Sequence, residues 1–209
     1  MLCFVVFGVV PALTQGCRRN AERGQAPCPK MEGIEMKTLE SLPVFESQNK
    51  PIFEPAAWRL AVDGLVGRRL ALSARDLLRF PRIGLESDFR CHEGWVVPKV
   101  KWEGVRIPPV LARAQTLPKA RFLTVHAGEY TFVLPIAEAR HPGVLLATHM
   151  NGEPLAPEHG APLRLVVPAE WDCFASVKWV QRLELTERRA RATGPSIALA
   201  RIGQRGPLV

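Results

Sequence analysis

The sequence has no pair of cysteines in a C-x-x-C arrangement, and this absence excludes the common structural zinc sites and c-type haem attachment. Its five cysteines are Cys3, Cys17, Cys28, Cys91 and Cys173. An odd number fits poorly with a complete disulfide framework. Cys17 and Cys28 can pair in an oxidising compartment, or both can stay free; the sequence leaves both readings open.

The sequence also lacks an apolar run long enough to cross a membrane as a helix, which takes about 20 residues. Residues 2–13 are almost entirely apolar but number only twelve. They resemble the core of a signal peptide, although no charged residue precedes them. Arg18-Arg19 follows the run, so it is not a twin-arginine signal. We expect an exported protein, periplasmic or membrane-anchored facing the periplasm, with a cytoplasmic protein as the alternative.

The positive charge is not arranged as it is in nucleic-acid-binding proteins. The formal net charge is +8, and five arginines against one glutamate place half of this excess in residues 186–209. No run of lysine and arginine is interleaved with aromatic residues, as a single-strand-binding surface would require. We therefore expect no nucleic-acid partner.

The composition is that of a folded domain with many loops. The chain has 209 residues, of which 47% are apolar and 23% charged, enough for one domain with a full core. Its 19 prolines argue against a helical bundle. We expect residues 1–41 to form an apolar leader and linker, residues 42–187 a folded domain, and residues 188–209 a basic tail.

Short β-rich runs and a few helix signals predict the fold class. Short helices are expected after Ser73, from Pro109 and from Ile136. The expected strands lie at residues 58–63, 121–126, 130–134, 144–150, 163–167 and 177–185. This pattern predicts an α+β domain with mixed β-sheets and short helices.

The stretch from Ser87 to Trp95 carries the densest polar chemistry in the chain. It places a thiol, an imidazole and a carboxylate together at Cys91, His92 and Glu93. The simplest interpretation makes Cys91 a small buried hydrophobic residue. Alternatively, its thiolate is a soft metal ligand, or a nucleophile with His92 or His126 as its base.

Two later stretches carry cations within apolar sequence. Arg164 lies on a predicted strand with apolar residues on both faces, so its guanidinium must find an anion. That anion is either a nearby carboxylate or a phosphate, which suits the planar fork of arginine. His159 can donate to the same anion from a loop, and Lys178 is either a surface residue or a phosphate binder.

Five motifs in order resemble the sulfite-oxidase-like molybdopterin oxidoreductases over residues 58–187. They are Arg-Cys-x-Glu-x-Trp at Cys91, Trp-x-Gly-Val from Trp102, Asn-Gly-x-Pro-Leu from Asn151, His-Gly-x-Pro-x-Arg from His159, and Ser-Val-Lys-Trp from Ser176. The cysteine motif is most similar to that of the molybdopterin-dependent methionine sulfoxide reductases. The resemblance implies their fold, with molybdenum–molybdopterin as the cofactor and Cys91 as the single protein ligand to the metal. It also implies that the pterin and its phosphate are bound by His159, Arg164, Ser176, Val177 and Lys178.

The residues that follow Cys91 differ from those of sulfite oxidases proper, which have arginines there for the sulfite anion. A carboxylate at Glu93 repels a dianion, so a small neutral S-oxide or N-oxide is the expected substrate. Glu93 either relays protons and orients a water, or is a structural hydrogen-bond acceptor. With no haem motif in the sequence, electrons are expected from a separate protein, a cytochrome or a membrane haem subunit. The alternatives are sulfite-type oxidation and a non-catalytic cofactor-binding module of the same fold.

Overall fold

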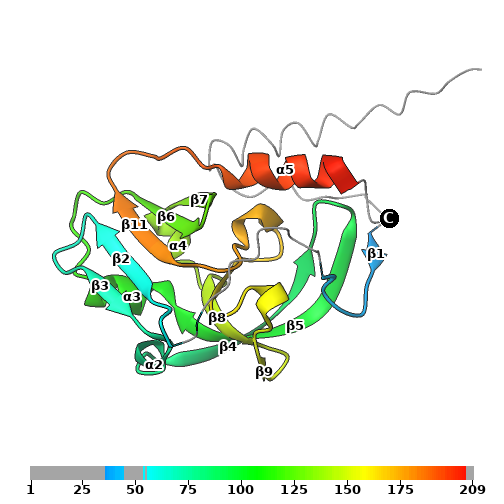
Figure 1. Ribbon diagram of the computed structural model, residues 1–209, viewed down its shortest axis with the longest axis horizontal. Helices are drawn as coiled ribbons and strands as arrows, with labels where there is room; N and C mark the ends of the chain where they lie inside the picture. Colours follow the sequence, from blue (N-terminus) through cyan, green and yellow to red (C-terminus); the bar gives the residue numbers. More distant parts are fainter. Residues whose placement is uncertain (1–35, 45–53, 55, 206–209) are drawn as a thin grey trace, which may run out of the picture.

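The structure is a computed structural model that describes residues 36–44, 54 and 56–205 of the chain (Figure 1). The helices are α2 (Ala74–Leu77), α3 (Ile107–Arg113), α4 (Ile136–Ala139) and α5 (Gly194–Arg205), with 3-10 turns η1 (Pro157–His159) and η2 (Cys173–Ala175). The strands are β1 (Lys37–Thr38), β2 (Leu60–Gly64), β3 (Leu70–Leu72), β4 (Arg82–Arg90), β5 (Trp95–Arg106), β6 (Phe122–Ala127), β7 (Tyr130–Pro135), β8 (Leu145–Met150), β9 (Glu153–Pro154), β10 (Arg164–Val166) and β11 (Arg182–Thr186).

A six-stranded sheet is built around the long β4–β5 hairpin (Figure 1). Strands β5, β8 and β10 pair antiparallel in that order, whereas β1 pairs parallel with β5. A bulge at Gly104 lets β5 approach β8 so closely that a methyl group on Gly104 would collide with the carbonyl oxygen of Leu146. Only glycine fits such a close backbone approach.

A five-stranded sheet runs in the order β3-β2-β11-β6-β7. Strand β11 lies between a parallel neighbour, β2, and an antiparallel neighbour, β6. The expected hairpin at residues 121–134 forms as β6 and β7. Two mixed sheets with short helices confirm the predicted α+β class.

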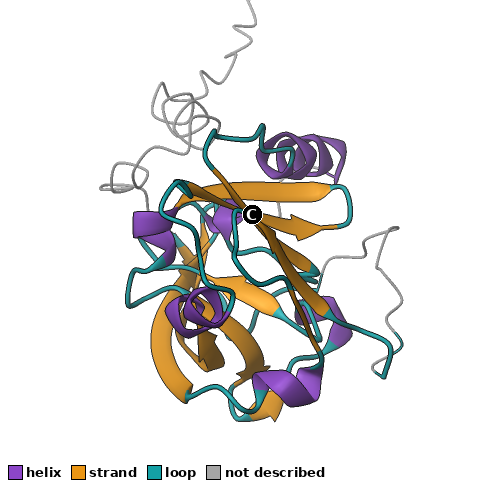
Figure 2. Ribbon diagram, turned by 90° about the vertical axis from the view of Figure 1, so that its left-hand side faces the viewer, coloured by secondary structure: helices purple, strands orange, loops and turns teal. Residues whose placement is uncertain are grey.

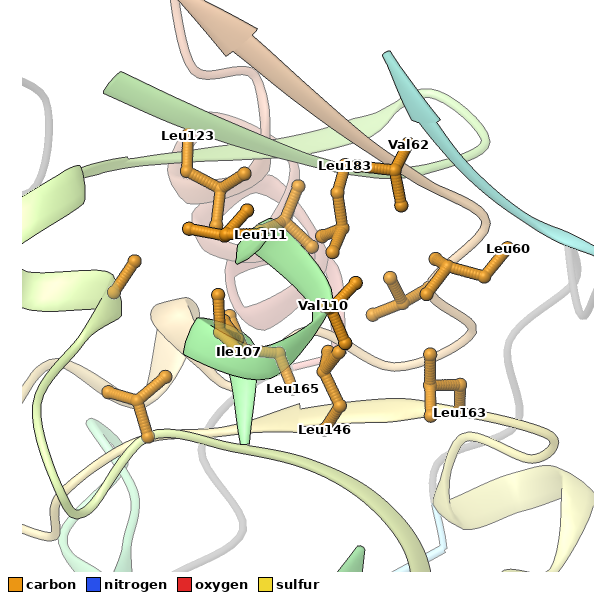
Figure 3. Close-up of a cluster of buried hydrophobic side chains, with 14 of the residues drawn as sticks. Leu60, Val62, Ile107, Val110, Leu111, Leu123, Leu146, Leu163, Leu165 and Leu183 are labelled. Carbon is orange, nitrogen blue, oxygen red and sulfur yellow. The ribbon is translucent and has the colours of Figure 1, made fainter. Parts of the chain in front are cut away.

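Helix α3 packs between the two sheets (Figure 3). Its residues Ile107, Val110 and Leu111 are almost fully buried. They contact leucines of both sheets, including Leu60 and Leu165, in one continuous core. Each such fully buried side chain stabilises the fold by about 1.5–3 kcal/mol. A second, smaller apolar cluster surrounds Cys91 and lies mainly within the six-stranded sheet.

The helix start predicted after Ser73 is confirmed, since α2 has the Ser73–Asp76 capping box. The start predicted at Pro109 is two residues late, because α3 begins at Ile107. The strand predicted at residues 177–185 is wrong in its first half. Strand β11 begins only at Arg182, and Trp179 has a positive φ of 59°. Hydrogen bonds of Trp179 N–H to Gly160 and of Val180 N–H to Leu163 hold this segment in a loop, overriding its β-branched composition.

Elements outside the expected domain bounds, residues 42–187, pack on the fold at both ends. Strand β1 precedes residue 42 and already belongs to the sheet. The expected basic tail contains α5, whose apolar side packs against β7 and η2 through Ala198, Leu199 and Ile202. In Figure 2 this helix is seen nearly end-on at the top of the molecule, above the strands. The expectation of a tail rested on the number of arginines. It overlooked that these three apolar residues are spaced as on one face of a helix.

The predicted leader, with Cys3, Cys17 and Cys28, lies outside the described residues. Within the described part of the chain, none of the helices has the length and apolar character needed to span a bilayer.

Candidate cofactor site

Cys91 occupies the tight turn between β4 and β5. Its N–H donates to Trp95 O at 2.9 Å, and Gly94 N–H donates to Cys91 O at 3.1 Å. Gly94 has a φ of +85°, a conformation that glycine adopts without strain. The turn leaves Cys91 only 9% exposed. Cys91 is therefore a nearly buried thiol at the tip of the β4–β5 hairpin, outside both strands.

The N-terminal strand β1 braces this turn. Lys37 N–H donates to Gly94 O at 2.9 Å, and Leu39 N–H donates to Val96 O at 2.8 Å. Leu42 is buried in the same apolar cluster as Cys91. Residues 37–42 thus stabilise the turn that carries Cys91, through backbone hydrogen bonds and through the apolar contact of Leu42.

Glu93 lies beside the thiol. Its Oε2 is 3.7 Å from Cys91 Sγ and accepts a hydrogen bond from Trp95 Nε1 at 3.4 Å. The carboxylate is therefore held by an indole that is itself 2% exposed. This arrangement fits both interpretations of Glu93, because a structural acceptor and a proton relay would occupy the same place.

Sequence reasoning missed the role of Cys173. Its Sγ accepts a hydrogen bond from His92 N–H at 3.3 Å, and the side chain packs against the cluster that contains Cys91. Interaction with the Cys91 thiol, followed by burial, raises the pKa of Cys173 well above its usual value. The only sign in the sequence that Cys173 lies near the site is its position three residues before Ser176.

The turn that carries Cys173 is itself held by polar contacts. Asp172 Oδ1 accepts from Phe174 N–H at 2.9 Å and caps η2. Burial raises the pKa of Asp172. The His92 ring lies 5.1 Å from the Phe174 ring. Within the described residues, His92 Nε2 and Asp172 Oδ2 are buried without a hydrogen-bond partner.

The alternative base for a thiol enzyme, His126, is engaged elsewhere. It lies on β6 of the five-stranded sheet, and its Nε2 is 2.9 Å from Glu184 Oε2 on β11. Cys91 lies at the tip of a hairpin in the other sheet. The structure thus gives no pairing of Cys91 with His126.

Arg164 is a buried cation surrounded by neutral groups. Its guanidinium donates to Ser176 Oγ at 3.3 Å and to His159 O at 3.0 Å. The rings of Phe89 and Trp102 lie 5.0 and 5.2 Å from it. None of the ion pairs formed among the described residues includes Arg164. Burial lowers its pKa to about 10, below the usual range of arginine.

The other predicted cofactor-binding residues converge on the η1 turn. Lys178 Nζ donates to Glu158 O at 2.7 Å, one residue before the His159 carbonyl that Arg164 contacts. Gly160, with a φ of +110°, ends η1 against Lys178. The structure therefore brings His159, Arg164, Ser176 and Lys178 together.

Val177 differs from this group. Its side chain is buried in the main core, and its N–H already donates to Ala175 O at 3.0 Å. The core contacts support the loop that carries Ser176 and Lys178. Val177 thus contributes to the site through the backbone position that it fixes.

The residues present fit a metal–pterin phosphate. Cys91 offers a soft donor suited to molybdenum, and Arg164 is a buried cation whose described contacts include no anion. Trp102 Nε1 and His92 Nε2 are buried polar atoms with no hydrogen-bond partner in the part of the chain that the structure describes. Native proteins rarely leave such atoms unsatisfied, so they are suitable contacts for a polar ligand.

These features define a molybdopterin-type oxidoreductase. Residues 47–193 match the family described as the oxidoreductase molybdopterin binding domain, and the chain belongs to this family. This confirms the resemblance seen in the sequence, the enzyme class and the molybdenum–molybdopterin cofactor.

The chain is similar to curated members of the family. It is 36% identical over 149 residues to the uncharacterized oxidoreductase YuiH of Bacillus subtilis, covering 70% of this chain and 75% of that protein. It is 31% identical over 171 residues to the protein-methionine-sulfoxide reductase catalytic subunit MsrP of Campylobacter jejuni, covering 72% of this chain. The chain spans only 56% of that subunit, little more than half its length.

A solved structure supports the same fold. The sulfane dehydrogenase SoxCD of Paracoccus pantotrophus superposes with a TM-score of 0.61 and 28% sequence identity. The match covers 66% of this chain and 40% of that chain.

Proposed function

We propose that the protein reduces a small neutral S-oxide by oxygen-atom transfer. The observation that carries this proposal is the Glu93 carboxylate, 3.7 Å from the Cys91 thiol. A fixed negative charge beside the reacting centre disfavours a dianion such as sulfite by a few kcal/mol at an effective dielectric constant of about 20. The 31% identity to the MsrP subunit of Campylobacter jejuni supports an S-oxide over an N-oxide.

Each proposed role follows from the chemistry of the side chain. Cys91 provides the thiolate that holds molybdenum, while Arg164, Lys178 and His159 hold the pterin phosphate. The bound metal supplies two-electron oxygen-atom transfer. Reduction of an S-oxide consumes two electrons and two protons and releases a thioether and one water. Glu93, whose carboxylate accepts the Trp95 N–H, would pass protons to the departing oxygen as it becomes water.

The electron source and location belong to the proposal as well. We propose a separate electron-transfer protein, a cytochrome or a membrane haem subunit, because two electrons must be returned after each turnover. We also propose export to the periplasm, which rests on the apolar residues 2–13 alone.

The experiment is a comparison of Glu93→Gln with the wild type, both loaded with cofactor. With a reduced viologen as donor, wild type should reduce a neutral sulfoxide, and sulfite should inhibit it weakly. Removing the charge should tighten inhibition by sulfite about tenfold or more, since about 1.4 kcal/mol is one decade. The KM for the neutral sulfoxide should change less than about threefold, because a neutral ligand has little interaction with that charge.

Glu103→Gln is the matched control, because Glu103 is a half-exposed carboxylate on β5 paired with Arg82. It should leave sulfite inhibition unchanged. The proposal fails if the loaded wild type oxidises sulfite, with an oxidised acceptor, as fast as it reduces the sulfoxide.

A further inference from the structure

Two thiols meet at the tip of the β4–β5 hairpin. Cys173 Sγ accepts the His92 N–H at 3.3 Å, and this amide directly follows Cys91 in the chain. The Cys173 sulfur therefore lies against the backbone of the Cys91 turn. Both side chains pack in the same apolar cluster, and the Cys91 thiol interacts with Cys173.

Neither thiol is fixed within a long ladder of strand hydrogen bonds. Cys91 lies between β4 and β5, and Cys173 is the first residue of the short 3-10 turn η2. Disulfides require Cα atoms about 4.4–6.8 Å apart, and any movement toward this geometry takes place in the two turns that carry the thiols. Both cysteines are free thiols in this structure.

We propose that Cys91 and Cys173 form a reversible disulfide in the cofactor-free protein, and that this bond blocks insertion of the cofactor. With hydrogen peroxide as oxidant, one thiol attacks the O–O bond, giving a sulfenic acid and one water. The second thiol then displaces the hydroxyl group, giving the disulfide and a second water. Two thiols lose two electrons and two protons, and one peroxide becomes two waters.

The blocking effect follows from competition for one sulfur. A metal binds the thiolate form of cysteine, which a disulfide removes. Conversely, a bound cofactor would engage the Cys91 sulfur and protect it. This consequence rests on Cys91 as the molybdenum ligand of the proposed function, whereas disulfide formation itself does not.

The first test uses full-length protein purified from a host that cannot make the pterin. The protein is reduced, freed of reductant and treated with one equivalent of hydrogen peroxide. Remaining thiols are then blocked with N-ethylmaleimide, and peptides are mapped without reduction. We expect a linked peptide pair containing Cys91 and Cys173, which disappears after dithiothreitol. The proposal is overturned if both cysteines are recovered alkylated, or if Cys91 is joined to Cys3, Cys17 or Cys28.

The second test measures molybdenum per chain after cofactor is supplied in vitro. Peroxide-treated protein should take up less than about a tenth of the molybdenum taken up by reduced protein, and dithiothreitol should restore uptake. Cys173→Ser should form no linked pair, with Cys173→Ala as a second variant if the serine variant misfolds. A mapped disulfide with undiminished uptake would overturn the blocking role and the assignment of Cys91 as ligand. If the loaded protein fails to reduce a sulfoxide but the Cys91–Cys173 peptide pair is still found, the proposed function fails and the disulfide proposal stands.

Discussion

At the scale of single residues, Arg164 is the strongest sign that this region binds a ligand and is not only part of the core. A guanidinium that is 3% exposed and bonded only to neutral groups is costly in the cofactor-free protein. The fall of its pKa to about 10, below the usual range of arginine, corresponds to roughly 3 kcal/mol at about 1.4 kcal/mol per pH unit. Since the pKa of this base is lowered, the cost is fully present at every pH below about 10.

Replacing Arg164 with methionine should therefore affect the two forms of the protein differently. Without cofactor, the lost hydrogen bonds and the removed burial cost should offset to within about 1 kcal/mol. Cofactor retention should weaken about ten- to a hundredfold, because one charge-assisted contact contributes roughly 1.5–3 kcal/mol. Thermal melting of both forms, with molybdenum content, checks this expectation.

Arg182→Met provides the control, because Arg182 is bonded to the Asp63 carboxylate at 2.9–3.0 Å on the five-stranded sheet. Its loss should lower the melting temperature of both forms equally. The same equal loss in Arg164→Met would make Arg164 a structural residue.

At the scale of elements, the η1 turn decides where the cations lie. A methyl group on Gly160 would stand 3.0 Å from Cα and Cβ of Lys178, at a φ of +110°. Gly160→Ala should therefore separate η1 from the Lys178 loop and lower molybdenum content per purified chain. Gly152→Ala has a similar φ of +87° but no atom within 4 Å. It should match the backbone strain, about 1–2 kcal/mol, and keep the cofactor; equal molybdenum losses in both would contradict this role.

Helix α5 should stabilise the turn that carries Cys173. It packs on β7 and η2, where the Tyr130 hydroxyl donates to Phe174 O at 2.7 Å. Leu199→Asp places a charge against this core and should lower the free energy of unfolding by about 1–3 kcal/mol. Ala200→Asp, on the exposed side, should change it by less than about 0.5 kcal/mol. Urea denaturation followed by tryptophan fluorescence measures both, and equal values would mean that α5 does not pack as described.

At the scale of the whole molecule, local patterns predicted most strands and three helices, because alternation and caps act over a few residues. The same patterns predicted a strand through Trp179, where long-range hydrogen bonds to Gly160 hold a loop. They also missed β1 and α5, whose stability depends on packing. The motif resemblance indicated Cys91, Arg164 and Lys178. It gave no sign that Cys173 reaches the Cys91 turn, because that contact spans 81 residues from His92 and depends on how the hairpin and η2 pack.

The site is divided between two distant parts of the chain, and this division has a consequence during synthesis. The thiol half is complete once β5 has formed, whereas Lys178 follows Cys91 by 178 − 91 = 87 residues. At roughly 5–20 residues per second, a ribosome needs about 4–17 s to add them. Until residues 159–178 are added, near the end of that interval, the nascent chain carries the Cys91 thiol without Arg164, Cys173 and Lys178. A cofactor cannot yet be held, and an oxidant that reaches the hairpin meets Cys91 without its neighbouring thiol.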